Sequence, residues 1–181
     1  MPTTGRISII GSAASTLTAP TFNQHGTMFD IVAPSYEYSD GTLSGQCDLA
    51  WSDRLTLPAG NTGIIGLVPL TWDNGGGAVI QLEVFGTQPS FTEVVGIVIS
   101  NRETAPGTRI LHFGPSFGAN PFLWLFAGAG DLAVLVPGGA YCMWSNEPQT
   151  TVGGTSDSLR FINTDGVNAV TFDILIVGRS V

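Results

Sequence analysis

One stretch of the chain has the spacing of a catalytic motif. Gly114-Pro115-Ser116-Phe117-Gly118 matches Gly-x-Ser-x-Gly, the pattern that carries the serine nucleophile of many hydrolases. His112 and His25 are the only histidines that could serve as the base. The motif also needs a helix directly after the serine, whereas Asn120-Pro121 follows here. We therefore predict a turn at this motif, assign no catalytic residue and expect the chain not to be an enzyme.

Residues suited to metal or cofactor chemistry are few. Cys47 and Cys142 are the only cysteines, and they are far apart without Cys-x-x-Cys spacing. The glycines at 75–77 and 128–130 lack the frame, the lysine and the helix that cradle phosphates. We expect no metal and no cofactor. Because the chain has no recognisable signal peptide, we expect synthesis in a cytoplasm and two buried free thiols, with a disulfide as the alternative.

Composition limits the partners of the chain. Hydrophobic residues make up 43% of the 181 positions and charged residues only 11%, with a formal net charge of −8. The six cations are all arginines, and they are spread singly along the sequence. Nucleic-acid binding depends on many neutralising contacts, so we expect no nucleic-acid partner. We expect no membrane partner for the same reason, and a surface with so little charge favours burial against neighbouring proteins.

Glycine and proline divide the chain into short segments. There are 24 glycines and 11 prolines, and the longest stretch without either is residues 46–57. Within it Leu49, Trp51, Leu55 and Leu57 share one parity, which is the alternation of a half-buried strand. The sequence therefore leaves little room for helices and predicts strands throughout.

The strands recur about every dozen residues without helical segments between them. This spacing predicts an all-β fold, specifically an antiparallel β-sandwich of jelly-roll type. We expect residues 1–22 to be an N-terminal arm or first strand and residues 23–181 to be a single sandwich domain. The predicted strands are residues 6–10, 28–33, 48–57, 63–71, 78–85, 92–100, 108–113, 122–127, 132–136, 140–145, 158–163 and 169–178.

The last two strands have the clearest pattern. Val170, Phe172, Ile174 and Ile176 alternate with mostly polar residues, and we expect this stripe to lie in the core. Asp165-Gly166 separates the two strands, and this dipeptide is typical of a tight hairpin turn. We therefore predict a closing β-hairpin.

Aromatic residues concentrate in residues 112–126, where they serve either core packing or an intersubunit patch. Residues 1–22, rich in small and hydroxyl side chains, are a second candidate contact. A different aromatic set, formed by Trp51, Trp72, Tyr36 and Tyr38, would suit sugar stacking. The candidate interface residues are Ile7, Ile9, Phe22, Phe113, Phe117, Phe122 and Trp124.

Residues 153–166, GGTSDSLRFINTDG, followed by residues 170–178, VTFDILIVG, resemble the ends of small all-β structural proteins of tailed bacteriophages. The resembling proteins are capsid decoration and fibre proteins, and the resemblance covers about a quarter of the chain. It implies a non-enzymatic virion protein, made in the host cytoplasm, that decorates the outer surface of the head. Its expected partners are the major capsid protein or other virion proteins, and further copies of itself in a homo-oligomer, most simply a trimer.

The sequence leaves several alternatives open. Within viruses, these are a tail or head fibre that binds host glycans and a shell-forming coat protein. Outside viruses, they are a carbohydrate-binding module and a small hydrolase that uses Ser116.

Overall fold

The structure is a computed structural model, and the part of the chain that it describes forms strands and no helix. It describes residues 5–7, 36–43, 46–83, 86–105, 108–116, 122, 126, 130–150 and 157–180, with the backbone only at 5–7, 36–40, 144 and 146–150. One sheet has four strands in the order β11 (Ala140–Thr150), β8 (Glu93–Asn101), β13 (Val170–Arg179) and β4 (Leu49–Leu57). The other has six in the order β10 (Ala133–Leu135), β9 (Leu111–Pro115), β12 (Ser158–Asn163), β5 (Thr62–Leu67), β6 (Leu70–Asp73) and β7 (Val79–Gln81).

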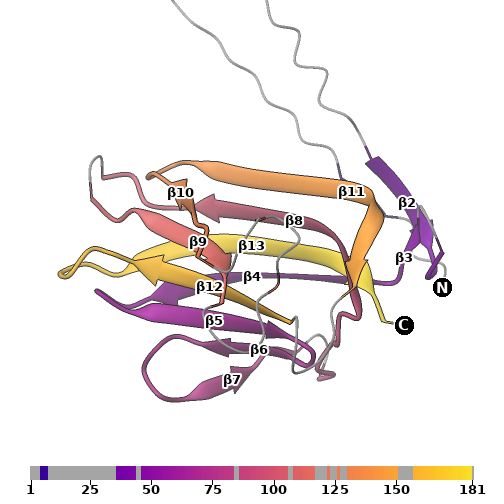
Figure 1. The fold of residues 1–181 in the computed structure, drawn as a ribbon, viewed down its shortest axis with the longest axis horizontal. Helices are drawn as coiled ribbons and strands as arrows, with labels where there is room; N and C mark the ends of the chain where they lie inside the picture. The colour runs from indigo at the N-terminus through magenta and orange to yellow at the C-terminus, as the bar shows by residue number, and fades with distance from the viewer. Residues whose placement is uncertain are drawn as a thin grey trace, which may run out of the picture.

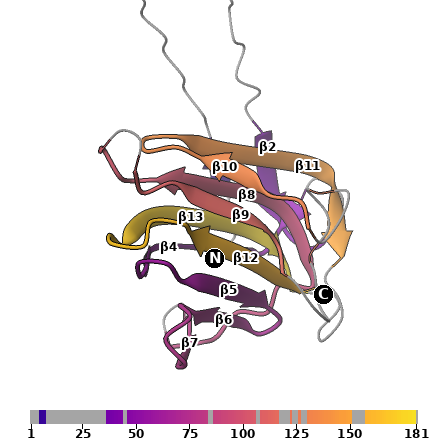
Figure 2. The same cartoon turned by 60° about the vertical axis from the view of Figure 1, so that its left-hand side comes forward.

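The strand order is that of a jelly roll. When β4, β5 and β8 to β13 are numbered one to eight along the chain, the four-stranded sheet runs 1-8-3-6. The matching strands of the larger sheet run 2-7-4-5, and β6 and β7 extend that sheet at one edge. All pairings within both sheets are antiparallel. The two sheets pack face to face (Figures 1 and 2), which confirms the predicted all-β sandwich.

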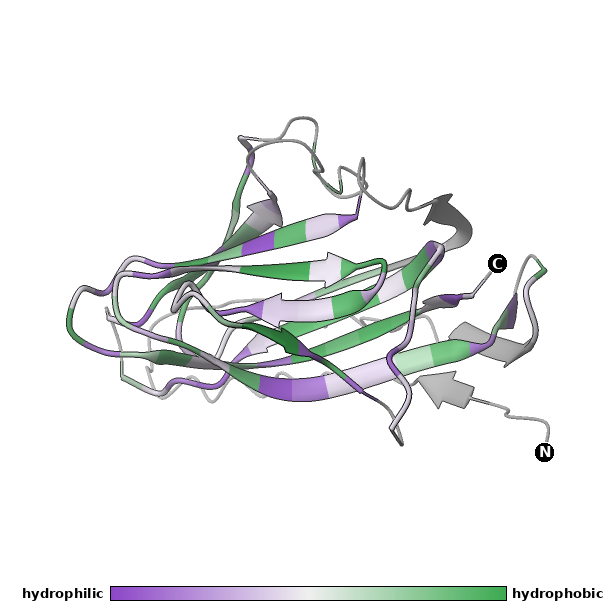
Figure 3. Cartoon of the chain, turned by 90° about the horizontal axis from the view of Figure 1, so that it is seen from below, coloured by the Kyte–Doolittle hydropathy of each residue, from purple (hydrophilic) through white to green (hydrophobic). Residues whose placement is uncertain are grey.

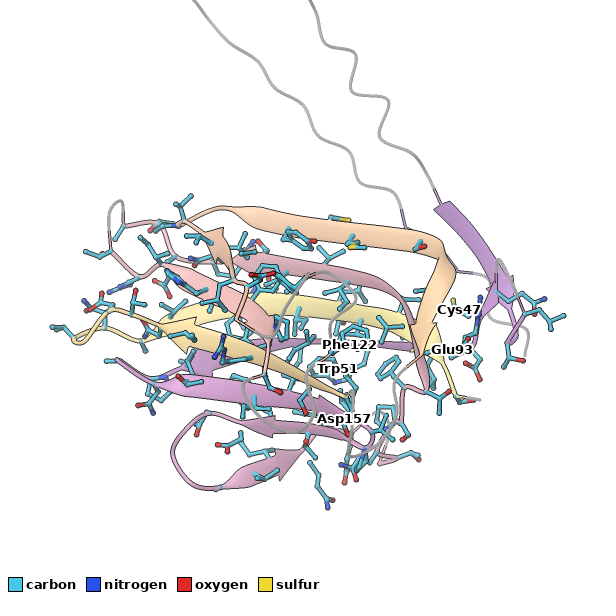
Figure 4. All side chains as sticks on the ribbon, in the orientation of Figure 1. Cys47, Trp51, Glu93, Phe122 and Asp157 are labelled. Atoms are coloured by element: carbon cyan, nitrogen blue, oxygen red, sulfur yellow. The ribbon has the colours of Figure 1, made fainter. Side chains whose placement is uncertain are left out.

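The core lies between the sheets because each strand points alternate residues inward, and Figure 3 shows this alternation of hydropathy along the strands. The alternation predicted for β13 is confirmed, with Val170, Phe172 and Ile176 completely buried and Ile174 nearly so. Trp51 and Phe122, labelled in Figure 4, also belong to this single large cluster.

The two closing strands do not form the predicted hairpin. β12 pairs with β5 and β9 in the six-stranded sheet, whereas β13 pairs with β4 and β8 in the four-stranded sheet. The segment between them therefore crosses from one sheet to the other, at the left of Figure 1. Asp165 still organises the bend, because its carboxylate accepts the backbone N–H groups of Val167 (2.8 Å) and Asn168 (3.1 Å).

Several strand boundaries differ from the predictions. The predicted strand at 63–71 is two antiparallel strands, β5 and β6, and β5 ends just before Val68-Pro69 because proline has no N–H for the ladder. The predicted strand at 108–113 begins later, at Leu111. The predicted strand at 28–33 lies outside the described residues, and the two described residues of 122–127 are not in a strand.

A small third sheet lies at one end of the sandwich, at the right of Figure 1. It consists of β1 (Gly5–Ile7), β2 (Tyr36–Asp40) and β3 (Gln46–Cys47), and β2 and β3 are parallel. The almost fully buried Arg179 fastens β3 to the sandwich, since its Nε donates to the carbonyl of Gln46 (2.9 Å) and its Nη1 donates to Glu93 (2.7 Å). Cys47 and Glu93 lie together at this end (Figure 4).

Candidate interaction surfaces

Two of the predicted interface residues have described side chains, and neither lies on the surface. Phe113 and Phe122 are completely buried within the chain, so their rings serve the core. Phe113 lies 4.9 Å from the ring of Tyr141 and 5.8 Å from that of Phe126, measured between centroids. Ile7 is the last residue of β1, for which the structure describes the backbone only. Ile9, Phe22, Phe117 and Trp124 lie outside the described residues.

The structure does not bring Ser116 and His112 together. Ser116 is buried, and its backbone N–H donates to the carbonyl of Ser158 (3.2 Å) in continuation of the β9 ladder. His112 lies four residues earlier on the same extended segment, and a strand advances about 3.3 Å per residue. The two residues are therefore separated by about 13 Å, beyond the reach of a hydrogen bond. The second histidine, His25, lies outside the described residues.

Among the described residues, neither Cys47 nor Cys142 is part of a disulfide. Cys47, on β3 of the small sheet, is half-buried, but Cys142 is exposed, so the prediction that both are buried is wrong for Cys142. Desolvation of its sulfur raises the pKa of the Cys142 thiol above its ordinary value of 9.0. Within the described ranges, no cluster of three or more histidine, cysteine, aspartate and glutamate residues could hold a metal ion.

The outer face of the four-stranded sheet is a surface formed by regular strands. Its side chains follow from the register, because Asp173 lies opposite Arg54 and Ser100, and Leu175 lies opposite Ser52 and Val98. Cys142 continues the second row on β11. We call this surface the four-strand face, formed by Ser52, Arg54, Val98, Ser100, Cys142, Asp173 and Leu175.

The four-strand face is hollowed over β8. Val98 and Ser100 have short side chains, and a shallow depression of about 360 Å³ lies over them between Arg54 and Leu175. At the end of the face near β3, Val95 and Val177 are almost completely buried and pack against Cys47. One end of this sheet face is therefore already covered by another segment of the chain, whereas the rest is open.

Two arginines meet one carboxylate on this face. Arg54 donates to Asp173 through Nε (2.7 Å) and Nη2 (3.2 Å), and Arg102 approaches the same carboxylate at 3.3 Å. The hydrogen bond from Arg54 lowers the pKa of Asp173, with a smaller opposing effect of burial. Arg54 and Arg102 have the most exposed arginine side chains in the described part of the chain, at 60% and 52%. Asp53 lines the same depression, so two arginines and two aspartates leave this cluster without net charge in a chain whose net charge is −8.

The opposite end of the sandwich is organised by two buried asparagines. Asn101 ends β8 and Asn163 ends β12, and each accepts the backbone N–H two residues further on, from Glu103 (3.1 Å) and Asp165 (3.0 Å). The Asn101 amide donates to the carbonyls of Arg109 and Leu135, both at 2.9 Å. Each asparagine thus fixes several loop segments at once.

The Asn163 amide makes a similar set of contacts. It donates to the carbonyls of Leu57 (3.3 Å), Pro58 (3.0 Å) and Asn168 (2.8 Å). Because these carbonyls belong to the β4–β5 and β12–β13 connections, one side chain holds both connections together. The end of the sandwich is therefore a rigid platform of loops.

A second depression opens between these loops. Its volume is about 430 Å³, and we call it the loop-end depression. Arg109 at its side has φ 59°, an uncommon backbone conformation for a residue other than glycine. Arg109 Nη1 donates to Glu103 (2.6 Å), and Nη2 lies 3.5 Å from the amide oxygen of Asn168. The lining residues are Thr108, Arg109, Ile110, Thr164, Asp165, Val167 and Asn168.

Neither surface was identified from the sequence. Both surfaces combine strands or loops that are far apart in the chain. In the loop-end depression, for example, the sequence around residues 108–110 gives no sign that this segment lies beside residues 164–168. The predicted sugar-stacking platform is also not formed by the tryptophans, since Trp51 and Trp72 are 4% and 3% exposed. The structure describes only the backbone of Tyr36 and Tyr38.

No helix in the described ranges is long and apolar enough to cross a membrane. The chain matches no protein-family model and no curated protein.

Proposed function

We propose that this chain is a non-enzymatic structural subunit of a virion, of the capsid-decoration type, which binds the outer surface of a phage head. The proposal combines the resemblance of its C-terminal segment to phage decoration and fibre proteins with the physical character of the four-strand face. Its partners would be the major capsid protein or other virion proteins, together with further copies of the chain.

The four-strand face is the observation that carries the proposal. A rigid, shallow surface formed by regular strands loses little conformational entropy when a partner covers it. Asp53 and Asp173 balance the two exposed arginines, Arg54 and Arg102, and the other side chains of the depression are short or apolar. Because the charges of this face balance while the chain as a whole is acidic, an acidic partner would meet less charge repulsion here than the net charge of −8 implies.

Self-association also fits the composition. Charged residues are only 11% of the sequence, and an interface buries weakly charged surface that would otherwise face water. We propose a homo-oligomer, with a trimer as the simplest arrangement for a decoration protein. A stable contact with the head would cover about 800 Å² on each partner, so it would extend beyond the depression of the four-strand face.

Mass photometry of the purified chain, followed by co-sedimentation with undecorated phage heads, tests the proposal. We expect an oligomer that sediments with heads in a fixed ratio. Ser52→Arg and Ser100→Arg add long cations to the four-strand face and should weaken assembly, whereas Thr62→Arg, on the opposite sheet, is the matched control. A monomer that ignores heads, or face variants that assemble like the unmodified chain, would contradict it.

A fibre or glycan-binding module is the second candidate. The loop-end depression favours it, because rigid loops at one end of a sandwich commonly carry binding sites. This alternative is compatible with an oligomeric virion protein, since fibres are oligomeric too. Failure to bind heads together with retained oligomerisation would favour it over decoration.

A further inference from the structure

We propose that the loop-end depression is a binding site for a neutral saccharide. At about 430 Å³ it falls within the usual range of small-ligand sites and is large enough for one sugar ring. Its lining mixes hydroxyl, amide, carboxylate and guanidinium groups with two aliphatic side chains, Ile110 and Val167. A sugar presents the same mixture, because its hydroxyl groups both donate and accept while its C–H groups are apolar.

The site is held in position before any ligand arrives. Asn101 and Asn163 fix the loops from below, as their amide hydrogen bonds reach four separate segments of chain. Asp165 accepts from the backbone N–H groups of Val167 and Asn168 and from the Asn168 side chain (3.1 Å). Pre-organised polar groups reduce the entropic cost of binding, which matters for a weakly held ligand such as a sugar.

Backbone strain also concentrates here. Arg109 adopts φ 59° although it carries a full side chain, and such conformations persist only where surrounding contacts enforce them. The contacts that enforce it are the hydrogen bonds to Glu103 and Asn168, and the carbonyl of Arg109 accepts from Asn101. This geometry keeps the Arg109 guanidinium, which is 36% exposed, at the side of the depression.

Charge selects a neutral ligand over an anion. Arg109 is the only cation of the lining, and it is already paired with Glu103 at 2.6 Å. Asp165 adds a carboxylate to the same depression, and the hydrogen bond from the Val167 backbone keeps the pKa of Asp165 below its ordinary value. A phosphate or uronate would thus meet the carboxylates of Glu103 and Asp165 and only one arginine, Arg109. A neutral sugar would instead find both hydrogen-bond donors and hydrogen-bond acceptors in the lining.

Two threonines offer free hydroxyl groups to a sugar. Thr108 and Thr164 are exposed, and within the described part of the chain neither hydroxyl has a hydrogen-bond partner. Val167 is 85% exposed and lies beside them as an apolar surface. Since the lining contains no aromatic ring, we expect a single site to bind in the millimolar range and an oligomer to bind more tightly through multivalency.

NMR titration of the isotope-labelled full chain with glucose, galactose, N-acetylglucosamine, glucuronate and inorganic phosphate tests the proposal. We expect saturable shifts at residues 108–110 and 164–168 with at least one neutral sugar and none with phosphate. Thr108→Ala and Thr164→Ala should each weaken binding about 2- to 10-fold. The matched control, Thr56→Ala on the outer side of β4, should bind like the unmodified chain.

Several results would overturn this site. Shifts that grow linearly with sugar concentration, shifts that appear elsewhere, or equal weakening by Thr56→Ala would each do so. Stronger binding of phosphate than of any neutral sugar would replace the saccharide with an anion. The test is independent of the proposed virion role, because a monomeric chain that ignores heads can still bind sugar, and an oligomer that coats heads can fail to do so.

Discussion

Phe161 and Phe172 stack face to face across the core, with ring centroids 4.8 Å apart and ring planes 15° from parallel. They are near neighbours in sequence, yet Phe161 lies on β12 of the six-stranded sheet and Phe172 on β13 of the other. The ring of Trp72 meets both edge-on, at 6.1 Å and 6.0 Å. The β12–β13 connection therefore crosses between the sheets next to an aromatic cluster that packs against both sheets.

Truncation of this stack should destabilise the domain strongly. Phe172→Ala removes a completely buried ring and leaves a cavity between the sheets, with an expected loss of about 3–5 kcal/mol in the free energy of unfolding. Urea denaturation followed by tryptophan fluorescence measures this loss. The control is Val167→Ala, which changes an 85% exposed side chain and should stay within about 0.5 kcal/mol of the unmodified chain. A similar loss for both variants would be inconsistent with the stacked core.

The asparagine contacts at the loop end should be nearly as important as the core. Asn163→Ala leaves the carbonyls of Leu57, Pro58 and Asn168 without their amide donor, and we expect a loss of about 2–3 kcal/mol. Asn74→Ala removes a hydrogen bond to Gly76 in an exposed turn and should cost less than about 1 kcal/mol. Equal unfolding midpoints for the two variants would show that Asn163 is not a structural hub.

Stability should fall in acid because three carboxyl groups are more acidic in the folded chain than in the unfolded chain. Burial alone would raise the pKa of Glu103, but hydrogen bonds from Arg109 and the Thr171 backbone outweigh it and lower the pKa. The pKa values of Asp165 and Asp173 are lowered as well. The unfolded chain then binds more protons in acid, so stability is full above the ordinary values of 3.8 and 4.5 and is lost as pH falls through the lower folded values.

Urea midpoints measured at a series of pH values from neutral to strongly acidic test this dependence. Asp173→Asn removes one of the three groups and should make the acid loss shallower. If the midpoint rises on acidification, the folded pKa values are raised rather than lowered, and the ion pairs with arginine do not stabilise the charged carboxylates.

Cys142 provides a reporter on the four-strand face. In a Cys47→Ser background its alkylation by iodoacetamide should still be accelerating with pH at pH 9, because the raised pKa keeps the thiolate a minor species at that pH. A rate that levels off near pH 8 would contradict the raised pKa. Oligomer formation or binding to heads should protect the thiol, and unchanged reactivity in the assembled state would place the contact elsewhere on the protein.

The sequence predicted the fold class because strand alternation and breaker residues are local properties. The stripe on β13 and the frequent Gly and Pro turns were sufficient to predict an antiparallel sandwich. Alternation indicates which side chains face inward but not which strand lies beside which. For this reason the pattern around Asp165-Gly166 suggested a hairpin, whereas β12 and β13 lie in different sheets.

The candidate sites were less predictable than the fold. The aromatic pattern at 112–126 suggested a patch, but Phe113 and Phe122 are core residues, since large rings stabilise most where both sheets cover them. The loop-end depression depends on loops that tertiary hydrogen bonds bring together. No short-range signal distinguishes Asn101 and Asn163 from ordinary turn residues.

The pairing of β4 with β13 joins Leu49–Leu57 to Val170–Arg179, with more than a hundred residues between them. β13 also lies between β4 and β8, so the four-stranded sheet has no continuous ladder until this strand has left the ribosome. Such long-range pairing slows folding, because loop closure must precede most stabilising contacts. During synthesis the nascent chain would thus expose unpaired edges of β4 and β8, and its yield in cells should depend on chaperone supply and temperature.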